Sequence, residues 1–158
     1  MRQLLLLRHG EAESAAPSSR DFERALTQWG RSEVIEAAAH IRRAGLTLDA
    51  ALVSPARRTR ETVELIHDAL HIRRISYEPS LYLGGPDTLL QTVQRCDADS
   101  QTLLLVGHNP GISELAQQLT TASDGIALRT AGLCWITLPQ DAWPALAMAS
   151  ASSFALLR

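Results

Sequence analysis

The sequence predicts an α/β fold: a three-layer sandwich in which helices cover both faces of a mainly parallel central sheet. Two features of the 158-residue chain support this prediction. Short apolar runs alternate with longer amphipathic stretches, which is the pattern of repeated strand–helix units. Several of the apolar runs also end directly in polar turns, as buried parallel strands do. The length fits one domain, residues 1–158, around a core of ordinary size.

The first part of the chain supplies two strands and a helix. Gln3–Leu7 is a continuous apolar run of the kind that a buried parallel strand requires. The polar segment Glu13–Arg24 is expected to be a surface loop. Over Thr27–Arg43 apolar residues recur at helical spacing, and Gly45 follows where a helix C-cap is expected. Leu48–Val53 is the second predicted strand.

The middle of the chain continues this alternation. Ser54 and Pro55 are expected to open a helix, with the serine as its N-cap and the proline in its first turn. Arg74–Tyr77 is a short predicted strand. Pro86–Arg95 carries leucines and a valine at helical spacing and is predicted to be a helix.

The last part of the chain adds the remaining predicted elements. Thr102–Val106 is the clearest strand in the sequence, and a turn rich in glycine, histidine and proline follows it. Ile112–Leu119 is predicted to be a helix, and Cys134–Leu138 and Phe154–Leu157 are predicted to be strands. Strand–helix alternation over the whole chain favours a mainly parallel sheet.

Composition and charge exclude several classes of function. A formal net charge of −2 gives no general attraction to nucleic acid or to an anionic membrane. The apolar run Leu4–Leu7 is too short for the hydrophobic region of a signal peptide or for a membrane span. Cys96 and Cys134 are expected to be reduced thiols, although a single disulfide between them stays open. We therefore expect a cytoplasmic protein.

Three turns at predicted strand ends carry polar chemistry. They are Arg8–Glu11, Ser54–Arg58 and Gly107–Pro110. Ligands of open α/β sheets bind beyond the carboxyl ends of the strands, so these turns are expected to meet at one site. Together they supply two imidazoles and two or three guanidiniums without an evident acidic partner, a combination that favours an anion. Arginine matches phosphate oxygens well, so the expected ligand is a phosphoryl group.

The residues of these turns suggest a phosphoryl transfer reaction. His9 is expected to be the nucleophile, because a histidine with an ordinary pKa is largely neutral at cytosolic pH. A backbone carbonyl that accepts the other ring N–H would fix its tautomer. Arg8, Arg58 and, if protonated, His108 are suited to stabilise the charge on the phosphoryl oxygens. Gly10 is expected to let the backbone approach the ligand closely.

Four segments of the sequence resemble the signature motifs of the histidine phosphatase superfamily, which includes the cofactor-dependent phosphoglycerate mutases. Leu7–Glu11 resembles the RHG signature, and Leu26–Gly30 resembles the LTxxG segment. Ser54–Thr62 resembles SPxxRxxxT, and Val106–Asn109 resembles the segment that carries the second histidine. The four segments occur in the order of the family and cover most of the chain from Arg2 to about Leu119.

This resemblance implies a phosphoglycerate-mutase-like fold and a function for each matching residue. His9 is then the residue that becomes phosphorylated, while Arg8, Arg58 and His108 hold the phosphate. Gly10 and Asn109 are candidate substrate-binding residues, although Asn109 is equally explained as a turn residue before Pro110. No cofactor and no metal are expected. His67 and His71 have metal-ligand spacing but no evident third ligand.

The sequence departs from the family at the general acid. Many members carry a carboxylic acid between the second arginine and the second histidine, and here Glu78 and Asp87 lie nearby but neither fits well. The Leu-Tyr-Leu pattern at residues 81–83, the short chain and the missing insertions resemble the SixA-like branch of protein phosphohistidine phosphatases. An imidazole leaving group needs far less protonation than an alkoxide, so phosphohistidine could be cleaved without that acid.

The predicted function is therefore the hydrolysis of phosphohistidine on a signalling or phosphotransfer protein, through a phosphorylated His9. The protein is expected to be a monomer. One alternative is a phosphatase for small phosphomonoesters that uses Asp87 or Glu78 as the acid. The other is a module that binds phosphoproteins without catalysis. A phosphoglycerate mutase is disfavoured because the chain and its loops are short.

Overall fold

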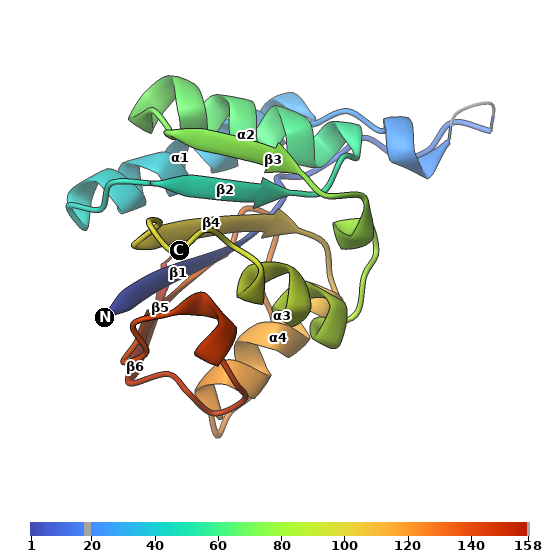
Figure 1. Cartoon of the computed structure of the whole chain (residues 1–158). Coiled ribbons are helices and arrows are strands. Elements are labelled where there is room, and N and C mark those ends of the chain that lie inside the picture. Colours follow the sequence, from blue (N-terminus) through green and yellow to red (C-terminus); the bar gives the residue numbers. More distant parts are fainter. Residues whose placement is uncertain (18–19, 158) are drawn as a thin grey trace.

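The computed structural model describes residues 1–17 and 20–157 of the chain. Its centre is a six-stranded sheet with the strand order β3-β2-β4-β1-β5-β6, and helices cover both faces of this sheet (Figure 1). The strands are β1 (Arg2–Arg8), β2 (Ala50–Val53), β3 (Arg74–Tyr77), β4 (Thr102–Gly107), β5 (Leu133–Leu138) and β6 (Ser153–Leu157). The α-helices are α1 (Gln28–Arg43), α2 (Arg57–Leu70), α3 (Pro86–Gln94) and α4 (Gly111–Thr120). The predicted three-layer α/β sandwich is confirmed.

The sheet is parallel over its first part and antiparallel at one edge. Strand β4 pairs in parallel with both β1 and β2, and β2 pairs in parallel with β3. Strand β5 runs antiparallel to β1, and β6 runs antiparallel to β5. The prediction of a mainly parallel sheet is therefore correct. Strand β5 is antiparallel because residues 121–132 carry the chain from the end of α4 back to the edge where β1 ends, so that Leu133 starts opposite Leu7.

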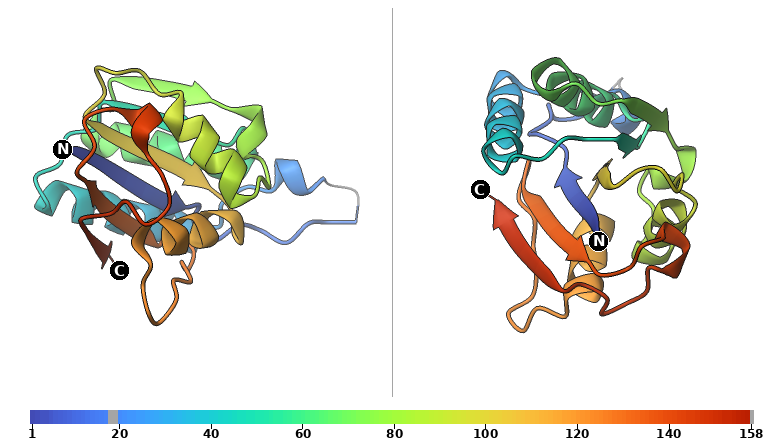
Figure 2. Two further views of the ribbon diagram at one scale, coloured as in Figure 1. Left: turned by 60° about the horizontal axis from the view of Figure 1, so that its bottom comes forward. Right: turned by 60° about the vertical axis from the view of Figure 1, so that its left-hand side comes forward.

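Two hydrophobic cores lie on opposite faces of the sheet. Helices α1 and α2 pack on one face, and α3 and α4 pack on the other (Figure 2). Side chains along each central strand alternate between the two cores: Leu5 and Leu7 of β1 face α1 and α2, whereas Leu4 and Leu6 belong to the other core. A strand that is buried on both faces needs an apolar residue at every position, which explains the unbroken apolar runs in the sequence.

The predicted elements agree with the observed ones except near strand β2. Gly45 lies just beyond α1 with a φ of +70°, a conformation that glycine adopts without strain. The predicted strand Leu48–Val53 begins only at Ala50. The Asp49 carboxylate just before it accepts hydrogen bonds from the backbone N–H groups of Gln101 and Thr102 at the start of β4. None of the helices in the described part of the chain is long and apolar enough to cross a bilayer.

The prediction that Ser54 caps the next helix is wrong. Helix α2 begins at Arg57, and its N-cap is Ala56, whose side chain makes no capping bond. The backbone of Ser54 still belongs to the sheet, because its N–H donates to the carbonyl of Val106 at 3.1 Å. Thr59 closes the turn instead, with its hydroxyl donating to the carbonyls of Ser54 and Ala56. The Ser54 hydroxyl is thereby left free to point to another residue.

The parallel register brings the ends of three strands to one edge of the sheet. Arg8 of β1 pairs with Gly107 of β4, and Val53 of β2 pairs with Val106 of β4. The turns that follow these strands therefore start side by side, at the right-hand end of the sheet in Figure 1. The segment between β1 and α1 lies at the same end and is closed at its base by a bridge between Ala12 and Leu26.

The turn after β1 is held against helix α1 by two glycines. A Cβ atom on Gly10 would lie 2.6 Å from the carbonyl oxygen of Gly30, and one on Gly30 would fall on the backbone of Glu11. Two backbone segments can approach this closely only where both residues lack a side chain. The contact fixes the turn at residues 9–11 relative to the first turn of α1.

Gly30→Ala should therefore destabilise the fold, although alanine is the better helix former by about 1 kcal/mol. The added methyl group collides with backbone that cannot move aside, so we expect a net loss of roughly 1–3 kcal/mol in the free energy of unfolding. Urea denaturation measures this loss. Gly85→Ala is the matched control, because a Cβ atom at that position would have no neighbour within 4 Å. Equal stability of the two variants would contradict the packing argument.

Candidate active site

A cavity of about 360 Å³ opens at the edge of the sheet where the three turns meet. Five residues that the sequence predicted as site residues line it: Arg8, His9, Arg58, His108 and Asn109. The other lining residues are Glu11, Ala12, Asp21, Arg24, Leu83 and Thr130. The cavity thus combines three arginines and two histidines with two carboxylates.

His9 is held in one orientation at the base of the cavity. Its side chain is 7% exposed, and its Nδ1 lies 2.7 Å from the carbonyl oxygen of Gly10. The Nε of Arg58 donates to Nε2 of the same ring at 3.3 Å. Since Nε2 accepts a hydrogen bond, the ring proton must be on Nδ1, where the carbonyl accepts it. The lone pair of Nε2 therefore faces Arg58 and the cavity. The hydrogen bond from Nδ1 to the Gly10 carbonyl is the backbone contact that was expected to fix the tautomer.

Burial keeps His9 neutral. Loss of hydration is the largest cause of a lowered pKa, and the carbonyl of Gly10 opposes it by favouring the charged ring. The positive charges of Arg58, Arg8 and Arg24 lower the pKa further, to about 4. The ring is consequently an uncharged base throughout the neutral pH range.

His108 lies beside His9 and is also neutral. The two ring centroids are 5.3 Å apart, and Nε2 of His108 lies 2.7 Å from the hydroxyl oxygen of Ser54. Burial is the largest cause that lowers the pKa of His108, to about 3, and the charge of Arg58 adds to it. The prediction allowed for a protonated His108, and its surroundings instead hold it uncharged. Ser54, predicted as a helix cap, in fact positions this ring.

The two arginines that the sequence predicted, Arg8 and Arg58, enter the cavity from different elements. Arg8 ends strand β1, and its Nη1 donates to the carbonyl of Leu128 at 3.1 Å. Its Nε is buried and has no hydrogen-bond partner in the described part of the chain. Arg58 comes from the first turn of α2 and is only 2% exposed. The neighbouring Arg57 and Arg60 are exposed on the surface.

The positive cluster has an acidic partner that the sequence analysis missed. Asp21 Oδ2 accepts a hydrogen bond from Nη2 of Arg58 at 3.1 Å, and its backbone carbonyl accepts one from Nη1 at 2.8 Å. The hydroxyl of Tyr82 donates to the same carboxylate at 2.6 Å. The hydrogen bond from Tyr82 is the largest cause that lowers the pKa of Asp21, to about 2. The expectation of guanidiniums without a nearby acid is therefore wrong.

Asp21 belongs to the segment Glu13–Arg24, which was predicted to be a surface loop. Ser18 and Ser19 of that loop lie outside the described residues. In residues 13–17 and 20–24 the segment is irregular apart from a short 3-10 helix at Asp21–Glu23. Polar loop composition correctly indicated the absence of regular structure, but it carried no signal that one carboxylate folds back onto Arg58.

Two residues predicted to bind substrate have structural partners. The close approach that Gly10 permits is toward Gly30 in helix α1, and Gly10 does not line the cavity. Asn109 does line it, but its amide donates to the carbonyl of Leu128 at 2.8 Å and its oxygen accepts from Ser113 at 2.5 Å. Both residues therefore shape the turns around the site through protein contacts.

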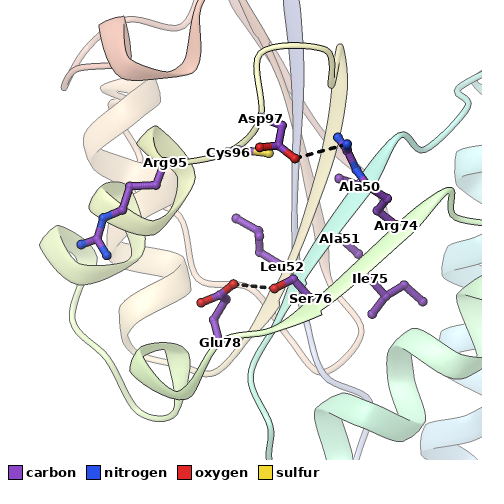
Figure 3. A pocket seen from close by; sticks show the side chains of 10 residues that line it. All are labelled: Ala50, Ala51, Leu52, Arg74, Ile75, Ser76, Glu78, Arg95, Cys96 and Asp97. Atoms are coloured by element: carbon purple, nitrogen blue, oxygen red, sulfur yellow. Dashed lines mark hydrogen bonds and ion pairs between the residues drawn. The ribbon is translucent and has the colours of Figure 1, made fainter.

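Neither carboxylate that the sequence offered as a general acid lines this cavity. Glu78 accepts a hydrogen bond from Ser76 and borders a different cavity of about 430 Å³, shown in Figure 3. Asp87 lies in the first turn of α3, outside the residues around His9. Glu11 does line the site, and its Oε2 accepts a hydrogen bond from the Thr27 hydroxyl at 2.7 Å.

Metal-ligating clusters and disulfides are lacking in residues 1–17 and 20–157. No group of three or more histidine, cysteine, aspartate or glutamate side chains there is placed to hold a metal ion. His67 and His71 have ring centroids 5.1 Å apart on α2 and its C-cap, away from the cavity. Cys96 and Cys134 are both free thiols.

Known proteins share both the sequence and the fold of this chain. The family model of the histidine phosphatase superfamily (branch 1) matches residues 4–82. An uncharacterized protein of Mycobacterium tuberculosis is 35% identical over 118 residues, which cover 74% of this chain and 72% of that protein. A structure from Nakamurella multipartitia that carries the name phosphohistidine phosphatase SixA superposes with a TM-score of 0.85 and 29% identity, covering 99% of this chain and 95% of its own.

A second solved structure places an oxyanion in a relative. It is the protein histidine phosphatase SixA complexed with tungstate, which superposes with a TM-score of 0.77 at 25% identity and covers 86% of this chain and 88% of its own. The fold is that of the phosphoglycerate-mutase-like phosphatases. With the paired histidines and arginines at the carboxyl edge of the sheet, these matches show that the chain belongs to the histidine phosphatase superfamily.

Proposed function

We propose that this protein hydrolyses phosphohistidine on a partner protein through a covalent phospho-His9 intermediate. Membership of the superfamily implies a phosphatase. The observation that carries the finer proposal is the charge state of the site: a neutral His9 stands among arginines, and Asp21, kept ionised by Tyr82, has no proton to donate at neutral pH. Similarity to SixA structures at 25–29% identity supports the same substrate class.

The first step uses the lone pair on Nε2 of His9. Arg58 donates to this atom, and a bound phosphoryl group would draw the guanidinium to its own oxygens. Attack by Nε2 forms the new P–N bond, and the bond to the leaving group breaks with its electron pair. The Nδ1 proton stays hydrogen-bonded to the carbonyl of Gly10, which stabilises the positive charge that the ring acquires.

Arg8, Arg58 and His108 are the groups proposed to stabilise the transferring phosphoryl oxygens. The Nε of Arg8 is buried without a partner in the described residues, so an oxyanion would supply a hydrogen bond that the protein does not. His108 is neutral and is oriented by Ser54, and its ring stands next to His9. Donors that are already in place need no rearrangement as charge develops in the transition state.

The second step returns His9 to its free state. Water attacks the phosphorus of phospho-His9, the P–N bond breaks toward Nε2, and phosphate is released. The leaving group in this step is also an imidazole, as in the first step on phosphohistidine. With a phosphoramidate substrate, the site therefore needs no change of protonation between the transfer to His9 and the hydrolysis of phospho-His9.

The ionisation of Asp21 is what favours a phosphoramidate over an ester. The hydrogen bond from Tyr82 keeps the pKa of Asp21 at about 2, so this cavity carboxylate is ionised at neutral pH. An ionised Asp21 has no proton to give to an alkoxide leaving group. Imidazole has a conjugate acid with a pKa near 6.5, so it departs without that help.

Hydrolysis of small phosphomonoesters is the second candidate, and Glu11 is the observation that favours it. Its carboxylate lines the cavity and is exposed to solvent, so it can reach a proton source. If Glu11 supplies the proton, Glu11→Gln will lower turnover of p-nitrophenyl phosphate and leave phosphohistidine turnover largely intact.

Single-turnover phosphate release tests the proposed reaction. We expect faster release from a phosphohistidine-bearing protein than from p-nitrophenyl phosphate, because only the ester needs a proton donor. His9→Ala should reduce both rates to background, and a 32P label should appear on the native chain but not on this variant. His40→Ala, a half-buried histidine of α1, is the control and should keep full activity. Fast release from the ester alone would contradict the phosphohistidine proposal.

Arg58→Ala should lower kcat/KM by roughly 10²-fold or more, because it removes donors from both the nucleophile and the phosphoryl oxygens. Steady-state kinetics with the same substrates measure this effect. Arg60→Ala removes an exposed arginine from the same helix and should change kcat/KM little. Equal effects of the two substitutions would show that Arg58 contributes only general positive charge.

The protonation of the two histidines predicts how the protein responds to pH. NMR titration should find pKa values of about 4 for His9 and about 3 for His108, and bound phosphate should raise both because an anion favours the charged ring. Since the unfolded chain binds protons near pH 6.5, stability must fall as the pH drops from 6.5 toward 4. The loss is on the order of 2 kcal/mol per histidine between pH 7 and pH 5. Titration of His9 near 6.5 would refute this account.

A further inference from the structure

The carboxylate of Asp21 is an unexpected group in a site that binds phosphate. It borders the same cavity as His9 and is about half exposed, with 45% of its side chain accessible. Arg58 connects the two residues, because its Nε reaches Nε2 of His9 and its Nη2 reaches Oδ2 of Asp21. The carboxylate and the attacking nitrogen are therefore hydrogen-bonded to the same guanidinium group.

Three side chains hold this carboxylate in place. Arg58 and Tyr82 donate to Oδ2 at 3.1 Å and 2.6 Å, and Arg24 Nε donates to Oδ1 at 3.0 Å. The Tyr82 ring is itself fixed between Phe22 and His108, at centroid distances of 5.0 Å and 5.6 Å. An ionised carboxylate has about four lone-pair positions, so one remains for a group that enters the cavity.

A fixed negative charge at this position opposes the binding of phosphate. It cancels part of the attraction of Arg58 and repels the phosphoryl oxygens. The arrangement is favourable only for a substrate that carries a positive charge close to its phosphoryl group. A phosphorylated imidazole meets this condition, because protonation of its second ring nitrogen leaves a cation directly attached to the phosphoryl group.

We propose that Asp21 accepts the ring N–H of the substrate's phosphohistidine and thereby selects phosphorylated imidazoles over phosphate esters. This inference rests on the function proposed above and adds the residue that recognises the leaving group. Asp21 would stabilise the protonated ring, in which the P–N bond is weakest. Hydrogen bonds between a carboxylate and a charged donor are among the stronger ones in proteins.

The step balances without a further proton donor. Nε2 of His9 bonds to phosphorus while the P–N bond of the substrate breaks, and its electron pair moves onto the departing ring nitrogen. The ring keeps the proton that faces Asp21 on its other nitrogen, so the product is a neutral imidazole. Asp21 stays ionised throughout, and its role is to hold the N–H of the leaving group.

Asp21→Asn tests the proposal with two small substrates, phosphoimidazole and p-nitrophenyl phosphate. The substitution preserves the shape of the side chain and removes its charge. We expect the ratio of kcat/KM for phosphoimidazole to kcat/KM for the ester to fall at least 10-fold, because only the phosphorylated ring loses a partner and the ester no longer meets a repelling charge. Glu23→Gln is the control, since it removes an exposed carboxylate from the same 3-10 turn.

Each other outcome has a definite meaning. Equal losses for both substrates would show that Asp21 acts only by positioning Arg58, and no loss for either would show that it has no role; both overturn the proposal. If the native chain hydrolyses the ester but not phosphoimidazole or phosphohistidine, the proposed function itself has failed. Retained ester turnover in Asp21→Asn also shows that this variant is folded.

The native protein offers a second test that needs no variant. Imidazole should inhibit ester hydrolysis more strongly as the pH is lowered through the pKa of the free ring, because its cation pairs with Asp21. Pyrazole is nearly isosteric but stays neutral over this range, so its inhibition should be weaker and independent of pH. Equal inhibition by the two rings at every pH would overturn the proposal.

Discussion

The parallel pairing of β4 with β1 and β2 is the constraint on which the rest of the molecule depends. It places Arg8, Ser54 and His108 at adjacent strand ends, although they are separated by about fifty residues each along the chain. The pairing is secured by apolar side chains on both faces of every central strand. A shift of register would move these side chains between the two cores and separate the turns at the same time.

The charge arrangement of the site follows from this framework. Burial at the strand ends removes water from both histidines and makes them neutral, while the arginines remain charged and restrained by carbonyl and carboxylate acceptors. Arg58 therefore donates hydrogen bonds to two groups of the site, the neutral ring of His9 and the carboxylate of Asp21. An incoming oxyanion has to compete with Asp21 for that arginine, so affinity for simple phosphate is moderated by the protein itself.

Much of the fold and most of the histidines and arginines that line the cavity could be predicted from the sequence. Buried parallel strands have a strong apolar signal, and Arg8, His9, Arg58 and His108 follow strand ends or match family motifs. Local rules failed where a residue had a tertiary partner. Ser54 has the residue type and position of a helix cap, but its hydroxyl contacts His108. Gly10 was expected to face the ligand, but its missing side chain makes room for the backbone of helix α1. Asp21 and Tyr82 were missed because a contact across 61 positions leaves no local pattern.

The bridge between Ala12 and Leu26 separates the site into two parts of different origin. The residues proposed to bind the phosphoryl group lie at the ends of the strands and in α2. Asp21 and Arg24 lie in the loop between Ala12 and Leu26, whose two ends pair at this bridge. Insertions or substitutions beyond the bridge leave the strand pairing and the Gly10–Gly30 contact untouched. The loop that carries Asp21 is therefore a part of the cavity wall that can vary in sequence without disturbing the strand pairing that places His9.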